Sequence, residues 1–229
     1  GIPVPGDDEH VMYVWFDALT NYISTTGWPD DEAGNFTKFW TEGETLQLAG
    51  KDQVRFQSIM WQAMLKSAGV AATDQVFYHG FINSGGQKMS KSLGNVISPY
   101  KMVEKYGTDA TRYLLLRHVH PTDDSDLTWE RMDEWYTAGL VNGLGNLTAR
   151  IMKMAETHLD GPIEKPAVAQ FADEYLQALD RYDFMAACDY IWQQVGKLDE
   201  TITETEPFKL VKEDMPAAQK IIAELVHDL

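Results

Sequence analysis

Two lysines and two serines lie within five consecutive residues of the segment GGQKMSKSLGN, which spans residues 85–95 and is called the lysine loop below. Lys88 and Lys91 offer compact positive charges, while Ser90 and Ser92 offer hydroxyl donors. The flanking glycines disfavour a helix or strand and let backbone amides approach a ligand closely. Such a loop suits a polyphosphate, although its composition alone favours an ordinary solvated turn.

Short apolar segments and one helix precede this loop. Segments 11–15, 46–50 and 76–82 are β-branched or aromatic runs bounded by turn residues, and 52–69 carries apolar residues at helical spacing. A strand, a helix and a further strand predict a parallel βαβ unit, and therefore an α/β fold. Ligands of parallel sheets bind beyond the carboxyl ends of the strands, where the lysine loop is expected.

Helices alone are predicted after the loop. Proline and glycine signals place one helix between Ser98 and Gly107, and a second begins at Thr108. Longer helical periods follow at about 134–158, 169–182, 184–204 and 215–228. These periods predict a helical bundle of roughly ninety residues.

Composition limits the classes of function. The chain has 229 residues, enough for two units, and its single cysteine excludes an internal disulfide and a cysteine-rich zinc site. The six histidines show no metal-binding spacing, so no protein-bound metal is expected. No apolar run suits a membrane span and no secretory signal is visible, which predicts a cytoplasmic protein without a membrane partner. The formal net charge of −16 argues against nucleic acid as a partner.

Five segments, taken in order, resemble a known family. KMSKS (88–92), followed by LGNVISP, resembles the second nucleotide-binding motif of class I aminoacyl-tRNA synthetases. The stretches VMYVWFDALTNYIS, LAGKDQVRFQSIMWQAML, YGTDATRYLLLR and LVNGLGNLTARIMKM stand in the order of the methionyl-tRNA synthetase family. The resemblance covers nearly the whole chain and outweighs the interpretation of the lysine loop as a solvated turn.

The resemblance implies a fold and an activity. Residues 1–98 would be the second half of a Rossmann-like nucleotide-binding domain, 99–135 a stem-contact segment and 136–229 an anticodon-binding helical bundle. The family's first motif, of His-Ile-Gly-His type, and its connective insertion are absent from the sequence, so we expect a fragment that is inactive alone. The family joins methionine to its tRNA through methionyl-adenylate, using ATP with Mg²⁺ as substrate.

The resemblance also assigns residues for activation of methionine. Lys88 and Lys91 would act catalytically on the leaving pyrophosphate, with Ser90 and Ser92 as further ATP-binding groups. Asp52 would lie near the adenosine; by itself it is also a reasonable helix N-cap.

Four residues, Trp15, Ala18, Tyr22 and Gln57, would surround the methionine side chain. Without the family context, Trp15 and Tyr22 are better explained as core aromatics. Gln57 departs from the family pattern, which has histidine at this position.

A second set of residues would read the anticodon. Asn142, Asn146 and Arg150 are spaced four residues apart, on one helix face, and Phe208 stands where the family has tryptophan. Spacing alone would also suit a polar exposed face. The conflict with the acidic net charge would be resolved by a local basic patch, for which the candidates are Arg112, Arg117, Arg131, Arg150 and Lys153.

Two alternatives stay open. A non-catalytic tRNA- or RNA-binding module derived from a synthetase would keep the bundle and a vestigial nucleotide half. A leucyl-, valyl- or cysteinyl-type synthetase is the other, although the stretch around Trp15 and the asparagine helix argue against it. The sequence does not predict the oligomeric state.

Overall fold

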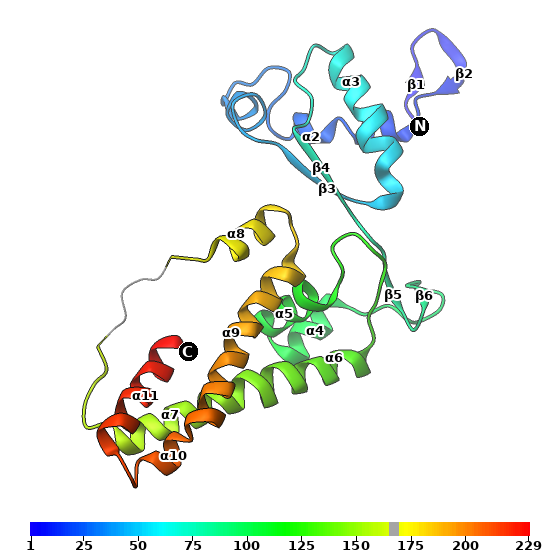
Figure 1. Ribbon diagram of the computed structural model, residues 1–229. Helices are drawn as coiled ribbons and strands as arrows, with labels where there is room; N and C mark the ends of the chain where they lie inside the picture. The colour runs from blue at the N-terminus through cyan, green and yellow to red at the C-terminus, as the bar shows by residue number, and fades with distance from the viewer. Residues whose placement is uncertain (165–169) are drawn as a thin grey trace. The chain divides into compact units, whose positions relative to one another are not determined.

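The structure is a computed structural model that describes residues 1–164 and 170–229. The chain forms two compact units, residues 1–81 and residues 82–229 (Figure 1). The expected boundaries at residues 98 and 135 separate segments by their expected roles and not by their packing, so the division into compact units does not test them and they stay a prediction.

The first unit contains the predicted βαβ arrangement. Strands β3 (Leu46–Gly50) and β4 (Gln75–His79) pair in parallel, with Leu46 opposite Gln75. Between them run the 3₁₀ turn η2 (Lys51–Gln53), the π-helix η3 (Arg55–Trp61) and helix α3 (Gln62–Ser67). Gly69 then takes a φ of 70°, which supports its prediction as the helix stop.

One face of this small sheet lies open. Leu48 on β3 is 65% exposed, and no strand of the described residues pairs with the outer edge of β3. The opposite face is closed, because the intervening Ala49 is buried. Parallel sheets are normally covered on both faces, so this one is only half covered within its own unit.

The predicted strand at 11–15 is wrong. An antiparallel hairpin of β1 (Pro3–Val4) and β2 (Asp7–Val11) ends where that strand should begin, and helices α1 (Val14–Ala18) and α2 (Asn21–Ser24) follow. Leu19 and Ile23, spaced four apart, pack with Trp61 in the core of the first unit. Burial at helical spacing therefore overrides the strand propensity of VMYVW. A π-helix, η1 (Thr37–Thr41), completes this unit.

The second unit begins with a sheet around the lysine loop. The expected strand at 76–82 is interrupted after β4, and β5 (Ile82–Ser84) pairs antiparallel with β6 (Gln87–Lys88) and parallel with β7 (Ser125–Asp126). Helices α4 (Pro99–Tyr106) and α5 (Thr108–His118) then run as predicted, separated by Gly107 at a φ of 80°. Their core includes Met102 and Leu114.

The helical bundle is confirmed, with more helices than predicted. One continuous helical run comprises α6 (Trp129–Trp135), the π-helix η4 (Tyr136–Gly145) and α7 (Asn146–His158). Then come α8 (Asp173–Asp180), α9 (Phe184–Thr205), α10 (Pro207–Leu210) and α11 (Met215–Asp228); α10 was not predicted. The predicted start at 169 lies outside the described residues.

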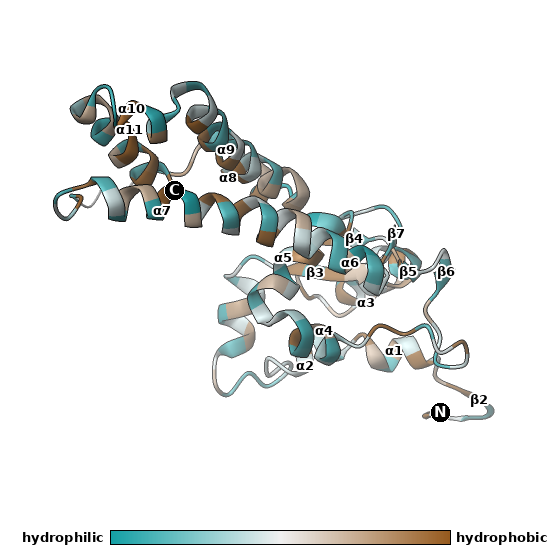
Figure 2. Ribbon diagram, turned by 90° about the horizontal axis from the view of Figure 1, so that it is seen from below, coloured by the Kyte–Doolittle hydropathy of each residue, from teal (hydrophilic) through white to brown (hydrophobic). Residues whose placement is uncertain are grey.

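The bundle is held by amphipathic helices, along which hydrophilic and hydrophobic residues alternate in Figure 2. Its core contains Leu147 and Ile151 from α7, Leu198 and Ile202 from α9, and Leu225 from α11. Burial of such side chains contributes about 1.5–3 kcal/mol each. The two long helices α7 and α9 are therefore fixed against one another by apolar contacts.

An aromatic cluster joins α5 to α9. Tyr113 stacks on Trp192 with ring centroids 4.9 Å apart, and the Arg117 guanidinium lies 4.8 Å from the same indole. Arg117 also forms an ion pair with Asp189 at 3.0 Å. These contacts place the expected stem-contact segment and the bundle in one compact unit.

Candidate active site and RNA-binding groove

The lysine loop is held by hydrogen bonds from two side chains. Asn95 accepts from the Ser90 amide at 2.8 Å and donates to the Lys88 carbonyl at 3.3 Å. Asp126, on β7, accepts from the Gly86 amide at 2.7 Å. Because backbone groups near both ends of the loop are satisfied in this way, the loop has a defined shape.

The loop exposes its two lysines and partly buries Met89, which lies between them. Lys88 and Lys91 are both exposed, whereas Met89 packs against the core under α4 and α5. Ser90 and Ser92 share a hydrogen bond of 2.7 Å between their hydroxyl oxygens. An anchored loop with exposed ammonium and hydroxyl groups is suited to binding phosphate oxygens.

Three of the four residues expected around methionine lie around one core in the first unit. Trp15 stacks on Phe56 with ring centroids 4.6 Å apart, and the ring of Tyr22 lies 5.9 Å from that of Trp61. Gln57 is only 3% exposed, and its Nε2 donates to the Tyr22 hydroxyl at 2.8 Å. All of these rings pack against the core of that unit.

The fourth residue, Ala18, ends α1 and is partly buried next to Leu19. Trp15 and Ala18 are three residues apart, and therefore share one face of the helical turn. The methyl group of Ala18 can form only van der Waals contacts, so no hydrogen bond ties it to Gln57.

Two buried polar atoms in this cluster lack partners. Among the described residues, Gln57 Oε1 and Trp61 Nε1 are buried without a hydrogen bond. Leaving such groups unpaired costs about 1–3 kcal/mol each, and a bound molecule can relieve that cost. Trp61 was predicted only as part of an apolar helix face. Its position four residues after Gln57 places both residues on one side of a helix, and this spacing was the signal that could have linked it to the site.

Replacing Gln57 with histidine is expected to make methionine binding pH-dependent. A neutral imidazole can keep one hydrogen bond to Tyr22, so the KM for methionine should stay within about threefold near pH 8. Burial lowers the pKa of an imidazole below its ordinary value of about 6.5, so KM should rise only at more acidic pH, where the ring gains a charge that the core disfavours. Pyrophosphate exchange by the product of the complete reading frame, with and without this substitution, checks the result across this range, with the KM for ATP as the internal control. Identical profiles for Gln57→His and the original chain would contradict it.

Asp52 does not cap a helix, so that alternative is wrong. It lies in η2, where its carboxylate accepts from Gln53 Nε2 at 3.3 Å and from no helix amide. A Cβ atom on Gly50 would lie 2.7 Å from Asp52 Oδ1, so a larger residue at the end of β3 would displace the Asp52 side chain. Asp52 is exposed just beyond the carboxyl end of a parallel strand, where ligands of such sheets bind.

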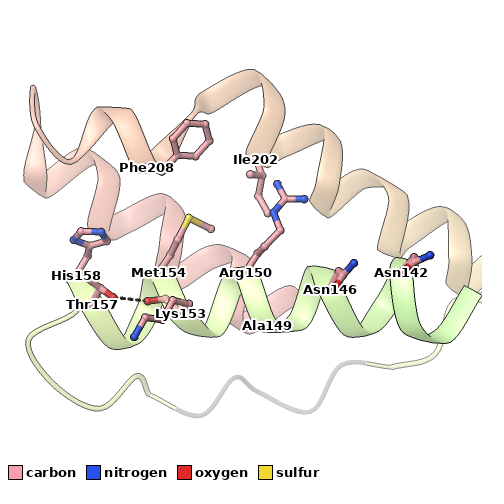
Figure 3. Close-up of a pocket in the computed structure, with 10 residues that line it drawn as sticks. All are labelled: Asn142, Asn146, Ala149, Arg150, Lys153, Met154, Thr157, His158, Ile202 and Phe208. Carbon is pink, nitrogen blue, oxygen red and sulfur yellow. Dashed lines mark hydrogen bonds between the residues drawn. The ribbon is translucent and has the colours of Figure 1, made fainter. Parts of the chain in front are cut away.

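The expected anticodon residues share one cavity. It has a volume of about 650 Å³ and lies among η4, α7, α9 and α10. Figure 3 shows Asn142, Asn146 and Arg150 in a row along one helix, with Phe208 across the cavity. Phe208 is 47% exposed, so its ring is available for stacking. The other lining residues are Ala149, Lys153, Met154, Thr157, His158 and Ile202.

The expected basic patch is largely neutralised. Four of its five candidates are paired with carboxylates over 2.7–3.2 Å, a fact that the sequence could not reveal. The pairs are Arg117 with Asp189, Arg131 with Asp126, Arg150 with Asp199, and Lys153 with Glu156. These residues therefore do not give the unit a general positive field.

Two negative findings bear on ligands. Within residues 1–164 and 170–229, no three His, Cys, Asp or Glu side chains gather closely enough to hold a metal ion. No helix in the same ranges combines the length and the apolar character that a membrane crossing needs.

Comparison with known proteins identifies relatives over almost the whole chain. The family described as tRNA synthetases class I (M) matches residues 1–152. The methionine–tRNA ligase of Fusobacterium nucleatum is 37% identical over 96% of this chain, and the enzyme named likewise from Mycobacterium tuberculosis is also 37% identical over 96%. The chain spans 36% and 44% of the lengths of these two relatives.

Solved structures agree with the sequence comparison. The Mycobacterium tuberculosis methionyl-tRNA synthetase bound by methionyl-adenylate superposes with a TM-score of 0.81 at 33% identity, covering 100% of this chain and 47% of the other. Its apo form gives a TM-score of 0.72. Since the family match covers well over half of the residues and the fold agrees, the chain belongs to the class I tRNA synthetases of the methionyl type.

Proposed function

We propose that this chain contributes the phosphate-binding loop, the methionine pocket and the anticodon-binding bundle of an enzyme that joins methionine to its tRNA. The observation that carries the proposal is the lysine loop, in which Met89 and Asn95 anchor the backbone while Lys88 and Lys91 stay exposed. ATP enters as the substrate together with Mg²⁺. The cytoplasmic location expected from the sequence stays a prediction.

In the first step, an oxygen of the methionine carboxylate attacks the α-phosphorus of ATP. The bond from that phosphorus to the bridging oxygen breaks, and the electron pair leaves with pyrophosphate. Lys91 and Lys88 neutralise the charge that grows on this leaving group, while Ser90 and Ser92 donate to its oxygens. In the second step, a ribose hydroxyl of the tRNA attacks the adenylate carbonyl, and AMP leaves.

The methionine side chain is held in the aromatic cluster of the first unit. Contacts between a thioether and aromatic rings such as Trp15 and Tyr22 contribute about 0.3–1.5 kcal/mol each. The unpartnered Gln57 Oε1 and Trp61 Nε1 support a ligand-binding role for the cluster, because a ligand's polar groups would pair with them. Asp52 would contact the nucleoside.

Unit 82–229 would bind the anticodon loop. Asn142, Asn146 and Arg150 can bond to the edges of unpaired bases, and a base stacked on Phe208 contributes about 1–3 kcal/mol. The groove is complete within this one unit. This completeness also supports the second candidate function, a non-catalytic module that binds RNA.

Methionine-dependent exchange of pyrophosphate into ATP distinguishes the two functions. We expect exchange with methionine, and not with leucine, valine or cysteine, from the product of the complete reading frame, and none from the 229-residue chain. Silence from both proteins would overturn the catalytic proposal and favour the RNA-binding module. Exchange with one of the other three amino acids would reassign the substrate.

A further inference from the structure

The ion pair between Arg150 and Asp199 is poorly explained by stability. Arg150 Nη1 donates to Asp199 Oδ1 at 2.7 Å, linking α7 to α9. The two side chains are 51% and 56% exposed, so water competes for both and the pair contributes little to folding. Ile151 and Ile202, both buried, already hold the same two helices together.

Asp199 lies in the proposed RNA-binding groove. It lines a second hollow of about 330 Å³ between η4, α7 and α9. Asn142, Asn146 and Arg150 line both this hollow and the larger cavity that contains Phe208, so the two hollows adjoin. A carboxylate repels phosphate and neutralises the guanidinium beside it, which makes this place unsuitable for the RNA backbone.

The same pair of groups is suited to the edge of a base. A guanidinium only donates hydrogen bonds and a carboxylate only accepts them, so the pair presents donors directly beside an acceptor. The Watson–Crick edge of cytosine offers two acceptors, O2 and N3, beside the N4 amino donor. Uracil has the acceptor O4 where cytosine has its amino group. O4 and the carboxylate would then be two acceptors side by side, and their lone pairs would repel one another.

We propose that Asp199 is a specificity-determining residue that accepts a hydrogen bond from the amino group of an unpaired base and disfavours uracil. This inference rests on the proposed binding of the anticodon loop to unit 82–229. The anticodon complementary to the methionine codon AUG is CAU, and UAU, complementary to the isoleucine codon AUA, differs from it only by uracil in place of cytosine. Asp199 would contact this first base of the anticodon and favour cytosine over uracil there.

The test measures binding of the 229-residue chain to two stem-loop RNAs that are identical except for a CAU or a UAU loop. We expect the original chain to prefer the CAU loop by about tenfold or more, the scale of one well-made base contact. Asp199→Asn removes the charge and gives a side-chain amide that can rotate to donate to O4. It should reduce the preference to about threefold or less, mainly by strengthening binding of the UAU loop.

Two further variants separate recognition from other effects. Asp133→Asn makes the same change in another exposed ion pair, with Lys105, whose two members lie outside both hollows, and it should leave the preference unchanged. Phe208→Ala should lower the affinity for both RNAs by similar factors, because a base of any identity can stack on the ring. Thermal unfolding of Asp199→Asn should match that of the original chain.

The outcomes lead to different conclusions. A preference that survives in Asp199→Asn, or an equal change for both RNAs, would overturn the role of Asp199 while leaving anticodon binding in place. Failure of the original chain to bind either RNA would overturn the proposed anticodon binding itself, and this inference with it.

Discussion

Replacing Lys91 with alanine is expected to lower kcat for methionine-dependent pyrophosphate exchange by about 10²–10³, with the KM for methionine changed less than threefold. Removing one preorganised group that stabilises transition-state charge has an effect of this size. Lys91 is exposed on an anchored loop in the second unit, whereas the methionine pocket is proposed for the first. Because the charge that Lys91 would stabilise develops only as pyrophosphate leaves, its loss should affect the chemical step rather than the binding of methionine.

The assay requires the product of the complete reading frame and a matched control. Lys66→Ala removes an exposed lysine from α3, far from the lysine loop in sequence, and should leave both constants unchanged. A rise in the KM for methionine at constant kcat after Lys91→Ala would reject the transition-state role. Loss of folding in Lys91→Ala is not expected, because its side chain is exposed and Met89 supplies the anchor.

The second large effect concerns stability and pH, and it comes from His118. Burial, with a further contribution from the nearby Arg117 charge, lowers the pKa of His118 from 6.5 to about 4, while Asp189 opposes this shift. The imidazole stacks on Trp135 with centroids 4.3 Å apart. Between these two pH values the unfolded chain binds a proton that the folded chain does not bind.

The free energy of unfolding should therefore fall as the pH drops from 6.5 to 4. The contribution of His118 is complete above pH 6.5 and lost below pH 4, and it amounts to roughly 2 kcal/mol after allowance for partial exposure. Urea unfolding at several pH values measures it. His118→Phe keeps an aromatic ring against Trp135 and should reduce the change of the free energy of unfolding with pH. His227→Gln, at an exposed site, should leave this pH dependence as it is in the original chain. Equal pH dependence in all three proteins would contradict the assignment.

Much of the fold was predictable because its signals are local. The parallel pairing of β3 and β4 followed from apolar runs separated by a helical period, and Gly107 marked the boundary between α4 and α5. The strand expected at 11–15 failed because the core selects Leu19 and Ile23 at helical spacing, a long-range effect that local propensity does not contain. The turn-rich character of residues 85–95 was recognisable from residue types, but strand β6 (Gln87–Lys88) within this segment was not expected, because it forms by pairing with β5 and not by local propensity.

The partners of charged residues were not predictable. Arg150 and Asp199 are 49 residues apart, and nothing in their local sequence indicates that they meet. The same holds for Asp126, which binds the Gly86 amide across 40 residues. Trp61 carried a weak signal as one apolar residue among several on a helix face, and only packing revealed its contact with Tyr22.

The open edge of β3 has a consequence for the behaviour of the chain at high concentration. An unpaired strand edge beside an exposed Leu48 is a template for association with another copy. Repulsion between copies that each carry a formal charge of −16 opposes this contact. Such repulsion reaches only about 10 Å at 0.1 M salt and about 3 Å at 1 M. The colloidal stability of the chain therefore depends on charge, and concentrated salt removes the barrier that keeps these edges apart.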